Sequence, residues 1–257
     1  LAPLENRFPD FDGFIGENNL KEMYLLLSRY DGDLKKSVVD LVDLKNFKIL
    51  QSWLPNSDLM NQLASEEGKF KNLKRDNNNL RTIIGHPILA NDGELIYRVA
   101  GGPIRKIDQC SKLIYQNTED RYHHSIEIDV NENIWSPSQL LYPRRKNKVF
   151  LDDHIAKISM EGKLQYQKSV KDIFIENDME YLLYSVGDRF FDLDPIHLND
   201  IQPVDFDSEF WKKGDVFISL RHQSMIMLYR PSTNQVLWKD VGKYYHQHDI
   251  DILDNNR

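Results

Sequence analysis

Alternation of apolar and polar residues is the dominant pattern along this chain, and the pattern recurs. Four segments share one plan, in which a short alternating run is followed by a polar turn of four or five residues and a second short run. These segments are 41–53, 104–117, 155–168 and 226–240, and their second runs carry Trp53, Tyr115, Tyr166 and Trp238. Alternating runs joined by a short polar turn predict antiparallel hairpins.

A second recurring phrase precedes three of these hairpins and follows the last one. In this phrase a histidine introduces an apolar, strand-like run. The histidines are His86, His124, His197 and His248. Segment 23–44, which overlaps the start of the first hairpin, follows the same plan without a histidine. Each hairpin together with its preceding phrase therefore predicts a unit of four strands.

The spacing of these units favours a β-propeller. The four aromatic landmarks are 62, 51 and 72 residues apart, which is close to one blade of ~40–50 residues plus loop insertions. We therefore predict an all-β fold, a propeller of four-stranded blades that forms a single domain over residues 1–257. Four blades and the start of a fifth are expected in this chain, with further blades beyond its C-terminus. A β-sandwich is the alternative architecture.

Two segments depart from the alternating pattern. Residues 61–81 are polar and helix-permissive, which predicts an insertion between two blades. Residues 168–177 form a second candidate helix.

Composition excludes several classes of function. The net charge of −7 argues against a nucleic-acid partner, because phosphate binding requires clustered Lys and Arg. A single cysteine excludes an internal disulfide. No stretch approaches the ~20 apolar residues of a membrane span. Neither a Gly-rich phosphate loop nor a nucleophile elbow occurs, so nucleotide-dependent chemistry is not expected.

The repeated histidines acquire a common location if the fold is a propeller. The innermost strand of each blade runs along the central channel, so residues that begin these strands meet at one mouth of it. Side chains two apart on a strand share a face, which pairs His197 with Asn199 and His246 with His248. Of the neighbours His123 and His124, the repeat places His124 in the channel.

Strand alternation also selects one residue of the run Ser219–Ser224. It predicts that Arg221 shares a face with Ser219 and Gln223 and points away from His222. Histidine, asparagine and arginine side chains that meet in one cavity would suit a tetrahedral anion.

Two other interpretations of these residues are open. A histidine at a strand end is commonly a structural residue, and His86, which precedes a proline, is interpreted in that way. Three imidazoles could also hold a zinc ion. An arginine in the same cavity would repel a cation, so we predict neither a metal nor a cofactor.

At these residues the sequence resembles the bacterial aryl sulfotransferases of the nucleotide-independent type, which are six-bladed propellers. The resemblance is carried by His197-Leu198-Asn199, by the run Ser219–Ser224 with Arg221, and by Gln247-His248, with His123-His124 as a weaker fourth stretch. It extends over about residues 86 to 252.

The resemblance implies transfer of a sulfuryl group from an aryl sulfate to a phenol through a sulfated histidine. It makes His248 the nucleophile, with His197 and Arg221 as further catalytic residues. His124 and Asn199 are implied to bind the sulfuryl oxygens, and His246 is added as a substrate-binding residue.

The partners implied by the resemblance are a small-molecule aryl sulfate and a phenol, in a periplasmic or other extracytoplasmic location. Whether the chain forms a homo-oligomer is open. Two other functions stay open as well: a non-catalytic propeller that binds an anionic or aromatic ligand or a protein partner, and a hydrolase or lyase with a metal held by histidines.

Overall fold

The computed structural model describes residues 13–14, 16–17, 21–64, 70, 72–143, 149–184 and 193–253. The strands are β1 (Tyr24–Asp31), β2 (Lys36–Asp43), β3 (Lys48–Trp53), β4 (Ile84–Leu89), β5 (Leu95–Val99), β6 (Gly102–Ile107), β7 (Leu113–Tyr122), β8 (Glu127–Ile128), β9 (Ile134–Pro143), β10 (Val149–Ile158), β11 (Leu164–Ser169), β12 (Leu198–Pro203), β13 (Val216–Leu220), β14 (Met225–Arg230) and β15 (Gln235–Val241). The helices are α1 (Ser57–Leu63), α2 (Leu73–Asp76), α3 (Val170–Glu176) and the 3₁₀ helix η2 (Glu180–Leu183).

Every strand pair among the described residues is antiparallel, and within each sheet most neighbouring strands also follow one another in the sequence; the exception is β7, which pairs with β9 and not with β8. Strands β1–β3 form one sheet and β12–β15 another, while β4–β11 form a single hydrogen-bonded sheet. Within the β4–β11 sheet, β7 pairs with β9 only at Arg121↔Gln139 and Tyr122↔Ser138. This short junction joins two successive meanders, β4–β7 and β8–β11.

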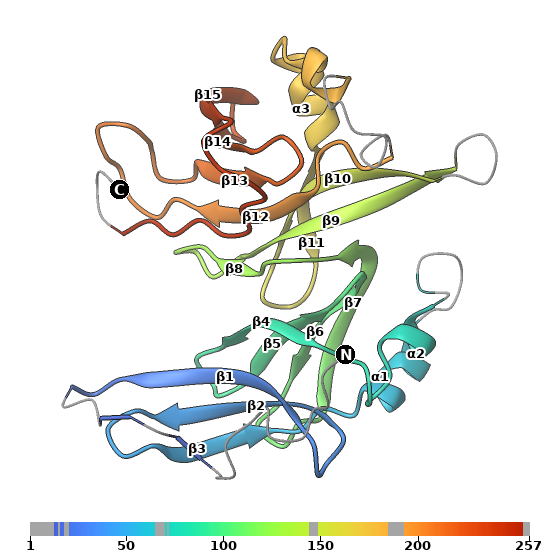
Figure 1. Cartoon of the computed structure of the whole chain (residues 1–257), viewed down its shortest axis with the longest axis vertical. Coiled ribbons are helices and arrows are strands. Elements are labelled where there is room, and N and C mark those ends of the chain that lie inside the picture. The colour runs from blue at the N-terminus through green and yellow to red at the C-terminus, as the bar shows by residue number, and fades with distance from the viewer. Residues whose placement is uncertain are drawn as a thin grey trace, which may run out of the picture.

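The sheets coincide with the units that the sequence repeats, except that the first has three strands among the described residues and not the predicted four. The predicted all-β propeller fold is confirmed. Figure 1 shows the sheets in chain order, with β1–β3 at the bottom, β4–β7 above them, and β8–β11 and β12–β15 at the top. The expected hairpin over 226–240 is β14–β15, and the candidate helix over 168–177 contains α3. Helices α1 and α2 lie between β3 and β4 in the sequence.

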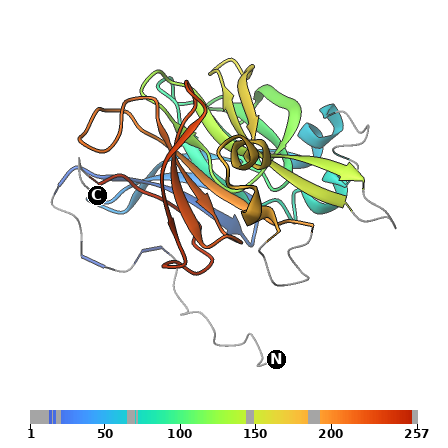
Figure 2. The same cartoon turned by 90° about the horizontal axis from the view of Figure 1, so that it is seen from above.

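Adjacent sheets bury apolar residues against each other. Ile104 of β6 and Ile134 of β9 belong to the cluster between the β4–β7 and β8–β11 meanders. The cluster between the β8–β11 meander and the β12–β15 sheet includes Ile155 of β10 and Ile201 of β12, and α3 contributes Phe174 to it. In Figure 2 this helix is seen end-on beside β12–β15. A sheet that packs on both faces needs apolar residues on both, which explains why β13 and β14 are buried along most of their length.

The segment after β15 departs from the expected pattern. Residues 246–252 were predicted to begin a further inner strand, but they form no strand in the structure. They run beside β12 and are held by hydrogen bonds that involve side chains, such as Asn199 Nδ2 to the Gln247 carbonyl at 2.7 Å and Ile250 N to Asp200 Oδ2 at 3.2 Å. No helix in the described part of the chain has the length and apolar character that crossing a membrane requires.

The core between the last two meanders gives a test of the fold. Phe174 is fully buried, whereas its neighbour Ile175 is 46% exposed on the same helix. We expect Phe174→Ala to lower the free energy of unfolding by about 3–5 kcal/mol, because it opens a cavity. Ile175→Ala should change it by no more than about 0.5 kcal/mol. Urea unfolding measures both, and equal effects would contradict this packing.

Candidate functional site

Four histidines adopt the same unusual backbone conformation. The φ angles are 47° at His86, 57° at His124, 53° at His197 and 54° at His246. Positive φ is uncommon for residues other than glycine and costs of order 1–3 kcal/mol. It recurs just ahead of β8, β12 and the segment after β15, and at the irregularity in β4 between Gly85 and Ile88, which indicates a repeated local backbone turn.

This conformation corrects the predicted repeat phase. The backbone equivalent of His124 and His197 is His246, not His248. His248 instead corresponds to Asn199, since each lies two residues after the left-handed histidine. The residues one position further on are acidic in three of the segments, namely Glu127, Asp200 and Asp249.

Rings from three distant parts of the chain lie together. The centroid of His124 is 5.1 Å from that of His197 and 6.2 Å from that of His248. The His197 ring is also 4.3 Å from that of His222. His248 is exposed, while His124 is partly buried. The cluster therefore has one accessible imidazole beside others that the fold holds in place.

A buried carboxylate supports two sides of this cluster. Asp153 of β10 is fully buried, accepts a hydrogen bond from the backbone N–H of Leu198 at 2.8 Å, and lies 3.3 Å from His123 Nε2. Burial raises the pKa of Asp153, but the contact with His123 and the other hydrogen bonds outweigh it and lower the pKa. Nδ1 of His123 lies 2.7 Å from Nδ1 of His124. One carboxylate thus positions both His124 and the start of β12.

The expected opposite orientation of His123 and His124 is wrong. Their rings are in edge contact, with centroids 5.0 Å apart. Both residues lie between β7 and β8, outside a strand, and the left-handed backbone at His124 breaks the alternation on which the expectation rested.

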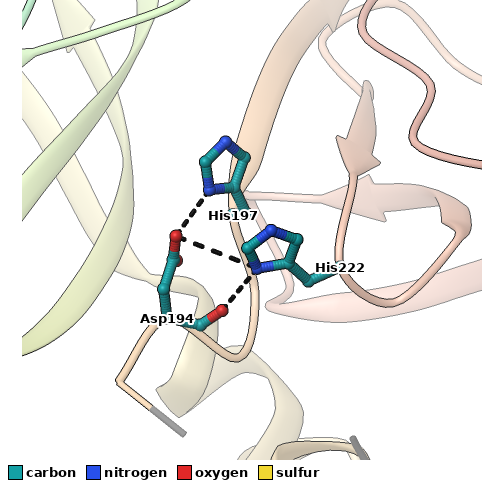
Figure 3. Close-up of side chains that lie close together, drawn as sticks. All are labelled: Asp194, His197 and His222. Atoms are coloured by element: carbon teal, nitrogen blue, oxygen red, sulfur yellow. Dashed lines mark hydrogen bonds and ion pairs between the residues drawn. The ribbon is translucent and has the colours of Figure 1, made fainter. Parts of the chain in front are cut away.

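Asp194 links two rings of the cluster (Figure 3). Nδ1 of His197 donates to Asp194 Oδ2 at 2.5 Å, and Nδ1 of His222 donates to the Asp194 backbone carbonyl at 2.6 Å. Each ring is thereby fixed with its Nε2 directed away from Asp194. The bond to the carboxylate also favours a proton on Nδ1 of His197, which leaves Nε2 of the neutral ring as a base.

The predicted orientation of Arg221 relative to His222 is also corrected. Residues 221–224 form the turn between β13 and β14, so strand alternation does not apply to them. Nη1 of Arg221 donates to Nε2 of His222 at 3.1 Å, which is consistent with a neutral His222. Burial lowers the pKa of His222, although Asp194 opposes the shift. The buried Nε of Arg221 has no hydrogen-bond partner among the described residues.

Gln247 fastens this turn to the segment that carries His248. Its side-chain amide donates to the carbonyls of Leu220 at 3.1 Å and Met225 at 2.9 Å, which flank the turn. Asn199 donates to the Gln247 carbonyl and is itself 1% exposed. The structure thus uses one N–H of the Asn199 amide to position the His248 segment.

The remaining predicted residues lie at the edge of the cluster. His246 stacks on Tyr245 with ring centroids 4.1 Å apart and lies 6.4 Å from His222. His86, interpreted as structural from the sequence, lies near both Arg98 and Asp249. Burial and Arg98 lower its pKa, and Asp249 acts in the opposite direction.

Comparison with known proteins identifies the family. A family model described as arylsulfotransferase (ASST) matches residues 86–257, which is more than half of the chain. The chain belongs to the arylsulfotransferase family. No curated protein matches it.

Solved structures resemble this arylsulfotransferase-family chain only remotely. The β-propeller domain of Cps50 (Swd1) from Myceliophteria thermophila is 6% identical with a TM-score of 0.45, over 91% of this chain and 60% of that one. BamB from Moraxella catarrhalis is 9% identical with a TM-score of 0.37, over 85% and 59%. A Bacteroides caccae protein of unknown function is 8% identical with a TM-score of 0.36, over 79% and 54%. This chain therefore spans between 54% and 60% of the length of these proteins.

The arylsulfotransferase-family chain carries a second guanidinium that the sequence analysis did not identify. Arg98 of β5 donates through Nε to the His124 carbonyl and forms no ion pair with a described carboxylate. Its guanidinium covers Gly85, where a Cβ would lie 2.8 Å from Nη2. Burial lowers the pKa of Arg98 to about 10, so the side chain stays cationic at neutral pH.

Two groups in this arylsulfotransferase-family chain have the composition of metal ligands. Asp194, His197 and His222 form one, and Glu127, Asp200 and Asp249 form the other; within each group the ligand atoms lie within 4.8 Å of one another. In the first group the 2.5 Å contact is shorter than the separation of about 3.3 Å between neighbouring ligands of a tetrahedral zinc ion. His197 and Asp194 in that group therefore have the geometry of a hydrogen-bonded pair and not of two zinc ligands.

His124 gives this site a specific dependence on pH. Burial, His123, His197 and Arg98 lower its pKa to about 3, which is below the value of about 6.5 for an unfolded histidine. The unfolded chain therefore binds more protons between these values, and the contribution of His124 to stability falls as the pH decreases from 6.5 towards 3. Asparagine, which tolerates positive φ, removes this titrating group.

We expect wild type to lose about 1–2 kcal/mol more stability than His124→Asn between pH 6.5 and pH 5. The difference between the two proteins should be constant from pH 7.5 to pH 9, where the ring is neutral in both states. Urea unfolding across this range checks the prediction, and parallel pH profiles below pH 6.5 would contradict it.

Proposed function

We propose that this protein transfers a sulfuryl group from an aryl sulfate to a phenol, with His248 as the nucleophile. The observation that carries the proposal is the meeting of His124, His197 and His248, with ring centroids 5.1 and 6.2 Å apart, beside the turn that holds Arg221. Membership of the arylsulfotransferase family supports the reaction class.

In the first step, a nitrogen lone pair of His248 attacks sulfur. A nitrogen–sulfur bond forms, the sulfur–oxygen bond to the ring breaks, and the aryl oxygen leaves with the electron pair. A covalent intermediate divides one difficult transfer into two easier ones. His248 is exposed, which gives a donor access, while Gln247 and Asn199 hold its backbone.

Charge on the transferring group needs fixed donors. Arg221 is held by a turn whose backbone N–H bonds to the His197 carbonyl at 3.0 Å, and its Nη1 contacts His222. Arg98 adds a guanidinium beside His124. Preorganised donors of this kind stabilise developing charge strongly, because they do not reorganise during the reaction. Removal of one such donor typically costs ~10²–10³ in rate.

In the second step, the acceptor phenol loses its proton to His197 Nε2 as its oxygen attacks sulfur. The nitrogen–sulfur bond breaks, and its electron pair returns to His248. Asp194 holds His197 in the tautomer that leaves Nε2 free, and it stabilises the imidazolium that forms. In this scheme Asp194 is a positioning residue for the base.

The reaction requires only the two small molecules, without a cofactor or nucleic acid, and we place it outside the cytoplasm because of the family resemblance. A second candidate function is metal-dependent hydrolysis at Asp194, His197 and His222, which offer a two-histidine and carboxylate set. The 2.5 Å hydrogen bond between His197 and Asp194 disfavours it. Acceptor-dependent transfer of the sulfuryl group, in place of hydrolysis of the aryl sulfate by water, would favour the first proposal.

Intact-mass spectrometry at neutral pH tests the covalent step. After treatment with 4-nitrophenyl sulfate in the absence of acceptor, wild type should gain one sulfuryl group, because the intermediate cannot be discharged. His248→Ala should gain none, whereas His246→Ala should still be modified. An adduct on any other residue, or nitrophenolate release that persists in His248→Ala, would overturn the assignment of His248.

The pairing of Asp194 with His197 predicts an effect confined to the second step. We expect Asp194→Asn to lower acceptor-dependent turnover about 10²–10⁴-fold, since an amide does not fix the required tautomer. The sulfuryl adduct should still form and should accumulate. Asp194→Glu should recover part of the turnover. Equal losses in adduct formation and discharge would show that Asp194 serves only the structure.

Because the Arg98 guanidinium covers Gly85, two variants can test the position of this guanidinium and its charge separately. Gly85→Ala retains the arginine but displaces its Nη2, while Arg98→Lys retains the charge without the planar fork. Both should raise KM for the aryl sulfate about tenfold. Gly32→Ala, in open space, is the matched control and should leave KM unchanged. An unchanged KM in both site variants would exclude Arg98 from donor binding.

A further inference from the structure

A cluster of three carboxylates lies next to the imidazole cluster and is not used by the proposed reaction. Glu127 of β8, Asp200 of β12 and Asp249 come from three distant parts of the chain, and one oxygen of each lies within 4.8 Å of the others. Each follows a left-handed histidine by three residues, so the repeated turn that gathers the imidazoles also gathers these side chains.

The cluster lacks compensating positive charge. Asp200 is fully buried; its Oδ2 accepts the backbone N–H of Ile250, but its Oδ1 has no hydrogen-bond partner among the described residues. None of the three carboxylates forms an ion pair with a described Lys, Arg or His. A buried carboxylate without a partner is costly unless it binds a proton or a cation.

A neutral oxygen outside the cluster also points to a ligand. The Ser125 hydroxyl is 1% exposed and makes no well-formed hydrogen bond within the described part of the chain, although it is a weak donor to the Asp200 carboxylate. It lies close enough to the Asp200 carboxylate to oppose the effect of burial on the pKa of Asp200. Buried hydroxyl groups are normally paired, so this oxygen and Asp200 Oδ1 share an unmet need for a ligand.

Without a bound cation, two carboxyl groups of the cluster have raised pKa values. Burial and the neighbouring carboxylates raise the pKa of Glu127 to about 8, and burial with Asp249 raises that of Asp200 to about 6. At neutral pH the empty cluster would therefore hold at least one proton. A bound cation would displace it, because the same oxygens would then be ionised ligands.

We propose that Glu127, Asp200, Asp249 and the Ser125 hydroxyl form a binding site for a hard divalent cation of the calcium class. Carboxylate and hydroxyl oxygens are the donors that such ions prefer. Calcium accepts oxygens at about 2.3–2.6 Å in flexible geometry, so two ligands on opposite sides of the ion are at most about 5 Å apart, as in this cluster. Magnesium demands stricter octahedral geometry with shorter bonds.

The position of this site gives the cation a structural role. Its ligands come from β8, from β12 and from the residue that follows His248. A bound ion would therefore connect the segments that carry His124, His197 and His248, independently of whether those rings transfer a sulfuryl group.

Cation binding to the full protein tests this inference. After removal of metal with EDTA and dialysis, isothermal titration with CaCl₂ should show one site, and the thermal midpoint should rise with saturating calcium. Magnesium should bind at least tenfold more weakly. Glu127→Gln and Asp249→Asn should each weaken calcium binding at least tenfold. Glu161→Gln, on an exposed turn, is the control and should bind as wild type does.

The stability in EDTA separates a lost ligand from a lost fold. Since the empty cluster is repulsive, both site variants should be at least as stable as wild type there and should gain less from calcium. The absence of saturable calcium binding, tighter binding of magnesium, or equal calcium binding by the site variants would overturn the proposal. These binding and stability experiments contain no aryl sulfate, so their outcomes are independent of the proposed transferase activity.

Discussion

The left-handed backbone at the histidines that precede the inner segments is the constraint on which the site depends. A single turn conformation, repeated at His124, His197 and His246, sets the position and direction of the inner segment that begins after each histidine. This conformation is unfavourable by itself, so other interactions must enforce it. Asp153 does so by connecting the start of β12 to His123, and Gln247 does so by bonding across the ends of β13 and β14.

The repeat also sorts charge along the mouth of the propeller. Imidazoles and the guanidinium groups of Arg98 and Arg221 gather at one level, and carboxylates gather three residues further along the inner segments. Burial keeps His124 neutral, and the hydrogen bond from Arg221 to His222 is consistent with a neutral ring. Arg98, whose pKa stays at about 10 in spite of burial, therefore adds positive charge beside a neutral His124.

Much of the fold was accessible from the sequence because its signals are local. Alternation, polar turns and repeated aromatic residues identified the hairpins, such as β14–β15, and a departure from alternation marked the candidate helix over 168–177, which contains α3. Repeat position also selected His124, His197 and His248. The phase at His246 was missed because a positive φ leaves no mark in the sequence when the residue is not glycine.

The other errors share a cause, which is the use of strand alternation where the chain turns. Residues 221–224 form a turn, so Arg221 and His222 contact each other instead of facing apart. Asp194 lies outside the repeated phrase, and Arg98 lies near the end of the first one, at a position that the repeat does not single out. Neither was identified, because only the tertiary fold brings them to the histidines.

The central claim is that rings from distant segments surround one anion site, and side-chain NMR of ¹⁵N-labelled histidine tests it most directly. On titration with sodium sulfate, signals of His124, His197 and His248 should shift together with one dissociation constant, and that of His154, on β10, should not move. Shifts with unrelated constants, or a response of His248 alone, would contradict the account.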